Sequence, residues 1–321
     1  MDPLLDVIDL HVQFRTLRGI VRALRGVFLR VYPEEVLALV GETGSGKTVT
    51  GLSILRLLDP SAEITKGEII FQGKDLLLLP EKEMLKIRGK DITMIFQEPK
   101  AALNPVMRVG DQIAEALIEH EEITKREARE RVLEYLTLVG LPDPERIYKM
   151  YPHEMSGGMA QRIVIAMALI HNPKLVIADE PTSSLDVTIQ AQIIDLIKDL
   201  VRKTGASSIF ITHDLGVAAE LADRIEVMYA GKAVEVGDIW EIFERPLHPY
   251  TEGLLKAIPK LGDKGELFSI EGEIPSLLKQ INGCAFAPRC PYAEDKCFSE
   301  EPPLVDVGGG HLVACHLRVG Q

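Results

Sequence analysis

The stretch EVLALVGETGSGKTVTGLSILRLL, residues 35–58, decides the fold of this chain. Its apolar run Val36–Val40 predicts a buried strand, and the apolar-periodic segment after residue 48 predicts a helix. Between them, GETGSGKT fits the pattern G-x-x-x-x-G-K-[ST] in full, in the strand–loop–helix context that supports it. The glycines let backbone N–H groups point inward at an anion, beside a helix N-terminus. We therefore expect a phosphate-binding loop rather than a chance glycine-rich turn, with the candidate residues Gly41, Thr43, Gly44, Ser45, Gly46, Lys47 and Thr48.

The composition narrows the class of partner. The 321 residues suffice for one large domain or two ordinary ones, and 36 basic against 48 acidic residues give a net charge of −12. An acidic chain does not favour nucleic acid as a partner, because phosphate backbones bind basic surfaces. The sequence has no apolar run of membrane-spanning length, and its N-terminus lacks a signal-peptide pattern. We expect a cytosolic-type chain.

A second predicted strand ends in two acidic residues. In KLVIADEP, residues 174–181, the apolar run Leu175–Ala178 is followed by Asp179 and Glu180. A carboxylate at such a strand end can bind Mg²⁺, and a second can polarise an attacking water. A strand that merely ends in two solvated acids is the alternative.

Other segments add polar residues at the ends of predicted elements. In HEMSGGMAQRIVIAMALI, residues 153–170, Ser156 is placed to cap a helix that begins near Gly157, which gives a second anion site. Gln97 follows the predicted strand 92–96, and His213 follows the predicted strand 208–212. Taken alone, a histidine after a strand is usually structural.

In this order, the motifs resemble those of the ATPase subunit of an ABC transporter, over residues 1 to about 245. The resemblance implies that the loop binds the β- and γ-phosphates of ATP. It implies that Thr48, Gln97 and Asp179 surround Mg²⁺. It also implies that Glu180 is the general base for the attacking water and that His213 contacts the γ-phosphate. The residue that stacks on adenine is left unassigned.

The resemblance further implies a dimer in which two subunits enclose two ATP molecules. Ser156, Gly157 and Gly158 would then close on the γ-phosphate of the ATP held by the opposite subunit. Asp186, in SSLD at residues 183–186, would lie at the dimer interface. The signature ends in Met159 where the common form has glutamine, but the serine and both glycines are retained.

A narrower resemblance covers nearly the whole chain. The segments FQEPKAALNPVMRVGDQIAEAL, ADEPTSSLDVTIQAQI and RPLHPYTEGLLKAIP resemble the oligopeptide/dipeptide/nickel importers. This implies ATP-driven import of di- or oligopeptides, with nickel or an oligosaccharide as alternative solutes. The implied partners are two membrane permease subunits, a homologous second ATPase subunit and, indirectly, an extracellular solute-binding protein. The chain would lie at the cytoplasmic face of the membrane. A soluble ABC ATPase acting on DNA or ribosomes is less favoured, because the chain has one cassette.

The expected fold is α/β, a P-loop NTPase core of the ABC ATPase type. We expect an antiparallel β subdomain and a helical subdomain at about residues 100–157 within an ATPase domain of residues 1–245. A small irregular extension, residues 246–321, would follow.

That extension holds every cysteine of the chain, with the spacing C-x5-C-x6-C-x17-C: Cys284, Cys290, Cys297 and Cys315. Disulfides are disfavoured in a reducing cytosol. Zn²⁺ and an iron–sulfur cluster both take four thiolates, with His311 and His316 as spare zinc ligands. Several relatives with this tail carry a four-iron cluster, so the resemblance favours [4Fe–4S] over Zn²⁺. A structural role is expected, and a redox- or metal-sensing role is the alternative.

Overall fold

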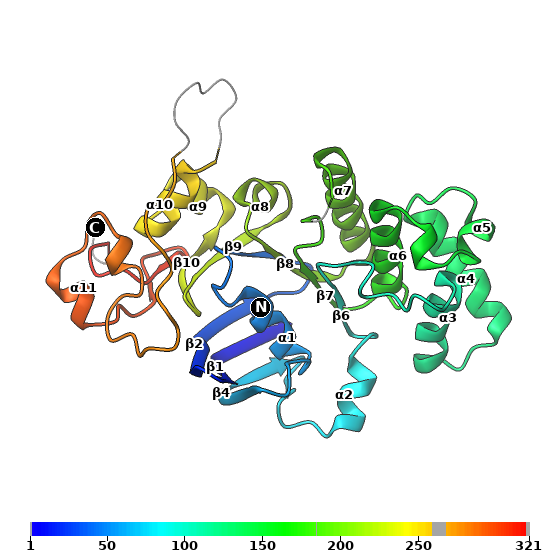
Figure 1. The fold of residues 1–321 in the computed structure, drawn as a ribbon, viewed down its shortest axis with the longest axis horizontal. Helices are drawn as coiled ribbons and strands as arrows, with labels where there is room; N and C mark the ends of the chain where they lie inside the picture. The colour runs from blue at the N-terminus through cyan, green and yellow to red at the C-terminus, as the bar shows by residue number, and fades with distance from the viewer. Residues whose placement is uncertain (1, 184, 259–267, 319–321) are drawn as a thin grey trace. The chain divides into compact units, whose positions relative to one another are not determined.

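The computed structural model describes residues 2–183, 185–258 and 268–318, which divide into two compact units. The first unit takes the described residues among 1–78 and 210–321, and the second takes those among 79–209. In Figure 1 the first unit is therefore blue at its N-terminal part and yellow to red at its C-terminal part. The second unit is an insertion in the sequence of the first.

The first unit contains an antiparallel sheet with the strand order β2-β1-β4-β5. Its strands are β1 (Leu5–Thr16), β2 (Gly19–Val31), β4 (Ala62–Phe71) and β5 (Lys74–Asp75). Buried apolar residues alternate along β1, as expected for a strand with one face on the core. The alternation shifts at Asp9, which has φ 48 and lies where the pairing register also shifts. The predicted antiparallel β subdomain is confirmed.

A second sheet of this unit carries the loop of residues 41–48 that the sequence predicts to bind phosphate. Its strand order is β11-β12-β10-β9-β3-β8, and the boundary between the units falls within β8. All five residues of β3 are buried, which explains the continuous apolar run before the loop. The strands are β3 (Val36–Val40), β8 (Ser207–Thr212), β9 (Arg224–Tyr229), β10 (Lys232–Asp238), β11 (Val305–Asp306) and β12 (Leu312–Val313). The helices are α1 (Lys47–Ile54), α8 (Leu215–Leu221), α9 (Ile239–Glu244) and α10 (Pro249–Lys256).

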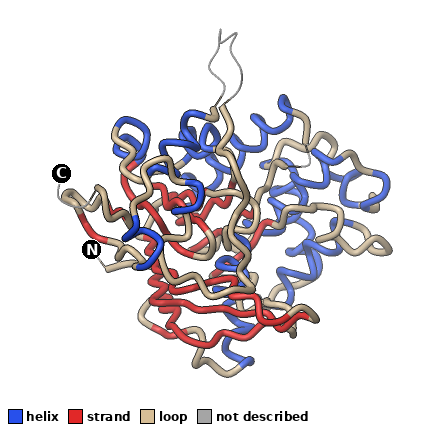
Figure 2. Tube along the Cα trace, turned by 60° about the vertical axis from the view of Figure 1, so that its left-hand side comes forward, coloured by secondary structure: helices blue, strands red, loops and turns tan. Residues whose placement is uncertain are grey.

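The C-terminal extension joins this second sheet. Strand β12 pairs antiparallel with β10, and β11 pairs antiparallel with β12. The remaining regular elements of the extension are the short helices η2 (Ala287–Arg289) and α11 (Asp295–Ser299). Loops, tan in Figure 2, make up most of residues 268–318. The extension is therefore largely irregular, as expected, but it also adds two strands to the second sheet of the first unit.

The second unit combines two parallel strands with a group of helices. Strands β6 (Ile92–Ile95) and β7 (Leu175–Asp179) are paired in parallel, and both are fully buried. Thr124 and Glu127 form a capping box at the start of α4, which fixes where that helix begins. The helices are α2 (Glu81–Ile87), α3 (Val109–His120), α4 (Lys125–Leu138), α5 (Pro144–Tyr148), η1 (Pro152–Glu154), α6 (Gly157–Leu169) and α7 (Val187–Thr204).

Among the described residues, no helix has the length and apolar character needed to cross a membrane.

Candidate functional site

The phosphate-binding loop joins β3 to α1, as the sequence predicts. Gly46 has φ 109, and a Cβ atom there would lie 2.7 Å from Leu24 Cδ2. A Cβ at Gly41 would lie 2.2 Å from the carbonyl oxygen of Met228. At Gly41 the clash is with backbone, and at Gly46 the φ angle is one that residues with a side chain rarely adopt, so the tight curl of the loop depends on these two glycines. Helix α1 then begins at Lys47, and the N-terminus of a helix is a favourable place for an anion.

The Lys47 side chain folds back over the loop. Its Nζ atom donates to the carbonyl oxygens of Gly41 at 2.7 Å and Glu42 at 3.1 Å, and the residue is 5% exposed. The ammonium group thus lies among carbonyl oxygens of the loop that the sequence predicts to bind phosphate. Thr48 and His213 also belong to the first unit and are exposed, Thr48 in the first turn of α1 and His213 directly after β8.

The second unit brings Gln97 and Glu180 together. Gln97 Nε2 donates to Glu180 Oε2 at 3.4 Å, although the two residues are far apart in sequence. Glu180 follows β7 in the left-handed region with φ 42, a conformation that is costly for a residue with a side chain. Such strain concentrates at functional sites. Asp179, the last residue of β7, is 4% exposed.

The predicted cap of α6 is confirmed. The hydroxyl of Ser156 accepts a hydrogen bond from the Met159 N–H at 3.2 Å, and α6 begins at Gly157. A Cβ atom at Gly158 would lie 3.0 Å from Ile189 Cγ2, so the bare start of α6 lies against α7. Asp186 caps α7 by accepting from the Ile189 N–H at 3.1 Å, a local role that the sequence reasoning missed. Ser184, in the same loop, lies outside the described residues.

The cysteine-bearing segment contacts the phosphate-binding loop, which the sequence did not indicate. Arg289, next to Cys290, donates from Nη1 to Glu42 Oε2 at 3.0 Å and to the Tyr229 hydroxyl at 3.2 Å. The same guanidinium donates to two backbone carbonyls, and the Arg289 side chain is 5% exposed. The N–H of Glu42 donates to the Tyr250 hydroxyl at 2.9 Å. The extension therefore holds both the side chain and the backbone of Glu42, inside the loop that surrounds Lys47.

A buried carboxylate also fixes the extension to β10. Glu235 is fully buried and accepts from the N–H groups of Leu247 and His248 at 2.7 and 2.9 Å. Its Oε1 atom also lies 2.8 Å from Nε2 of His311, which is 3% exposed. His311 is thus engaged with Glu235 rather than with the cysteines. Burial lowers the pKa of His248 to about 4, so this imidazole is neutral at pH 7.

The four cysteines, all free thiols, line one small cavity together with His316. Backbone N–H groups donate to the sulfur atoms of Cys284, Cys290 and Cys315. Burial raises the pKa of the Cys284 thiol to about 11, so without a metal it is protonated at pH 7. N–H donors directed at sulfur are a feature of thiolate metal centres.

The predicted metal site is not itself shown by the described residues. Across the ranges 2–183, 185–258 and 268–318, no three or more His, Cys, Asp or Glu side chains are arranged to hold a metal ion. The shared cavity and its N–H donors are what the structure gives in favour of that site.

Comparison with protein families gives two matches. Residues 24–183 match the family described as ABC transporter. Residues 234–297 match the family described as oligopeptide/dipeptide transporter, C-terminal region. The second match includes three of the four cysteines and Arg289.

Individual relatives cover almost the whole chain. The chain is 53% identical over 320 residues to the dipeptide transport ATP-binding protein DppD of Bacillus subtilis (strain 168), covering 99% of this chain and 96% of that protein. It is 54% identical over 313 residues to the oligopeptide transport ATP-binding protein OppD of the same strain, covering 97% of this chain and 87% of that protein.

Solved structures agree on the fold. A dimeric ATP-binding cassette in a post-hydrolysis state, bound to ADP and Pi, matches with a TM-score of 0.66 and 28% identity over 73% of this chain and 98% of that one. The cbiO1 protein of Clostridium perfringens, part of an ABC transporter complex, matches with a TM-score of 0.64 and 26% identity over 76% of this chain and 92% of that one.

Proposed function

The chain belongs to the ABC transporter family, in its oligopeptide and dipeptide branch, and from that premise we propose how its residues use ATP. It is an ATP-binding and ATP-hydrolysing subunit that powers peptide import. The observation that best supports this function is the geometry of the loop between β3 and α1. Gly41 and Gly46 allow its tight turn, and the Lys47 side chain folds back over it. A loop of this geometry binds the phosphates of a nucleotide through backbone N–H groups and one lysine.

We propose the following roles at one ATP. The loop residues 43–48 bind the β- and γ-phosphates, and Mg²⁺ is bound by Thr48, Gln97 and Asp179. Glu180 is the general base that orients and polarises the attacking water. His213 contacts the γ-phosphate and stabilises charge as the phosphoryl group transfers. The hydrogen bond from Gln97 to Glu180 and the left-handed backbone of Glu180 support this assignment, because both hold the carboxylate in one place.

Phosphoryl transfer depends mainly on positioning and charge neutralisation, so a site that is completed only on closure couples hydrolysis to movement. We propose that Ser156, Gly157 and Gly158 act on the ATP held by a second ATPase subunit. The capped start of α6 supports this role, because its N–H groups form an anion site. Asp186 would lie at the interface between the two subunits. We propose that the second subunit is a homologous but different chain.

We further propose that the chain works at the cytoplasmic face of the membrane, bound to two permease subunits that receive peptide from an extracellular solute-binding protein. The alternative solutes are nickel and oligosaccharides. The test is ATP hydrolysis by the transporter assembled in lipid vesicles, with the binding protein loaded with each solute in turn. Stimulation by peptide alone supports the proposal. Stimulation by nickel or an oligosaccharide, with none by peptide, contradicts the choice of solute.

The cysteine cavity is proposed as the site of a [4Fe–4S] cluster bound by Cys284, Cys290, Cys297 and Cys315. Four thiols around one cavity, three of them accepting N–H donors, fit the ligand set of such a cluster. When bound, the cluster would cross-link the extension; Zn²⁺ is the alternative ligand. Iron and zinc analysis of protein purified without oxygen separates the two. Four iron atoms per chain, with an absorption band at about 400 nm, support the cluster. One zinc ion per chain in a colourless protein contradicts it.

A further inference from the structure

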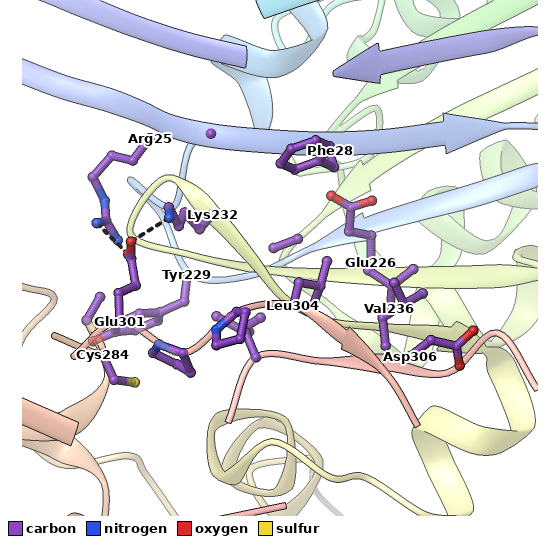
Figure 3. Close-up of a pocket in the computed structure, with 18 of the residues that line it drawn as sticks. Arg25, Phe28, Glu226, Tyr229, Lys232, Val236, Cys284, Glu301, Leu304 and Asp306 are labelled. Atoms are coloured by element: carbon purple, nitrogen blue, oxygen red, sulfur yellow. Dashed lines mark hydrogen bonds and ion pairs between the residues drawn. The ribbon is translucent and has the colours of Figure 1, made fainter. Parts of the chain in front are cut away.

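A second, larger cavity lies in the first unit, and none of the residues assigned to ATP lines it. Its volume is about 820 Å³, which falls in the range of small-molecule sites. One wall comes from β2, a second from β9 and β10, and a third from the extension around β11 and β12 (Figure 3). The residues that matter here are Arg25, Phe28, Glu226, Lys232, Val236, Glu301, Leu304 and Asp306.

The wall formed by β9 contains a carboxyl group that the fold does not explain. Glu226 is 1% exposed, and its Oε1 atom has no hydrogen-bond partner. Arg224, on the same strand, is the nearby cation, but its guanidinium pairs with Glu35 at 2.8 Å. A buried polar atom without a partner is costly, and native proteins keep few of them. In Figure 3 the Glu226 carboxyl lies below the Phe28 ring, at one end of the cavity.

The other end of the cavity carries positive charge. Arg25 Nη1 and Lys232 Nζ both bind Glu301, at 3.0 and 2.6 Å. Two cations that share one carboxylate leave a net positive charge at that end. Between the two ends the lining is apolar, with Leu304 between Glu301 and Glu226 in Figure 3.

We propose that this cavity binds a small zwitterionic molecule with an apolar body, such as an apolar amino acid or short peptide. The ammonium group of the ligand donates to the unpartnered Oε1 of Glu226, whose carboxyl group gives up its proton and is ionised when the ligand is bound, and the ligand's carboxylate lies at Arg25 and Lys232. The apolar body packs against Phe28, Leu304 and Val236. This proposal stands on the cavity alone and does not depend on the roles assigned at the ATP site. Because the walls come from the core strands and from the extension, a bound ligand holds the two together.

The test is titration of the purified full-length chain with leucine, dileucine and trileucine, followed by calorimetry and by the thermal unfolding midpoint. At least one of the three binds saturably below about 10 mM and raises the midpoint. Acetylation of the amine, or amidation of the carboxylate, weakens the binding of that ligand by about tenfold or more. The Glu226→Gln variant, which keeps the shape of the side chain, weakens the unmodified ligand to a similar extent.

A matched control is Glu68→Gln, which changes an exposed glutamate on β4 outside the cavity and leaves binding unchanged. ATP binding by both variants serves as the check that they are folded. The proposal is wrong if none of the three ligands binds to the wild-type chain. It is also wrong if the blocked ligands bind as well as the free one, or if a folded Glu226→Gln variant binds as well as the wild type.

Discussion

The Glu226→Gln substitution should make the folded chain less sensitive to pH. Burial raises the pKa of Glu226 from its ordinary value of 4.5 to about 8. Between these values the folded chain keeps a proton that the unfolded chain has released. Raising the pH therefore favours unfolding: the stability is fully present below pH 4.5 and is lost as the pH rises towards 8. At about 1.4 kcal/mol per pH unit, the whole effect is about 5 kcal/mol, of which about 3.5 kcal/mol falls between pH 5 and 8.

The assay is urea unfolding of the wild type and the variant at several pH values between 5 and 8. Glutamine does not titrate, so the difference between the two proteins isolates this carboxyl from the other titrating groups. The same holds for the charged groups that line the cavity with Glu226, among them Arg224, Arg30 and Asp306: they are present in both proteins, so their effects cancel in the difference. The variant should gain about 3.5 kcal/mol over the wild type as the pH rises. A difference that stays constant within about 1 kcal/mol would show that the carboxyl is hydrated or ionised in the folded chain, and would refute the reasoning.

Three further predictions concern the loop and the extension. Arg289→Met should weaken ATP binding, measured as the dissociation constant in an equilibrium titration. In a double-mutant cycle with Glu42→Gln, the effects of the two substitutions on the free energy of ATP binding should differ from their sum by about 0.5–3 kcal/mol, because the two side chains contact each other. Additive effects would show that this contact does not matter for ATP binding. Gly46→Ala should weaken ATP binding, since φ 109 is strained for alanine and its Cβ would also crowd Leu24 Cδ2 at 2.7 Å and the Ala23 carbonyl oxygen at 3.2 Å. Gly73→Ala, at φ 76 with open space around it, should cost about 1 kcal/mol of stability and leave ATP binding intact. Equal losses of ATP binding would contradict the loop argument. Cys315→Ser should lower the metal content of the purified chain and its thermal unfolding midpoint together, and unchanged metal content would rule this thiol out as a ligand.

Much of the ATPase core could be predicted because local signals determine it. The strand Val36–Val40, the cap at Ser156 and the strand ending at Asp179 follow from short patterns of apolar, capping and turn residues. The pairing of Gln97 with Glu180 could be anticipated only through the family resemblance, because the two residues come from separate strand ends.

The features that the sequence did not predict depend on contacts between segments far apart in the chain. The contact of Arg289 with Glu42 spans 247 residues, and no local pattern predicts it. The pairing of β12 with β10 involves two residues on each strand, too few to give a periodic signal. Glu226 did leave a signal: a glutamate inside the apolar run of β9 is a polar residue at a buried strand position. Its meaning depends on the cavity, which forms only when the extension lies beside the core strands.

The central claim is that this chain hydrolyses ATP to power peptide import, with Glu180 as the general base. The most direct measurement follows ATP hydrolysis and labelled-peptide transport together, in vesicles that contain the assembled transporter with the wild-type or the Glu180→Gln chain. The wild type should couple the two activities. The variant should bind ATP normally and lose hydrolysis by about 10²–10⁴-fold, with transport lost in parallel. Near-normal hydrolysis by the variant would contradict the role of Glu180, and hydrolysis by the wild type without peptide transport would contradict the claim as a whole.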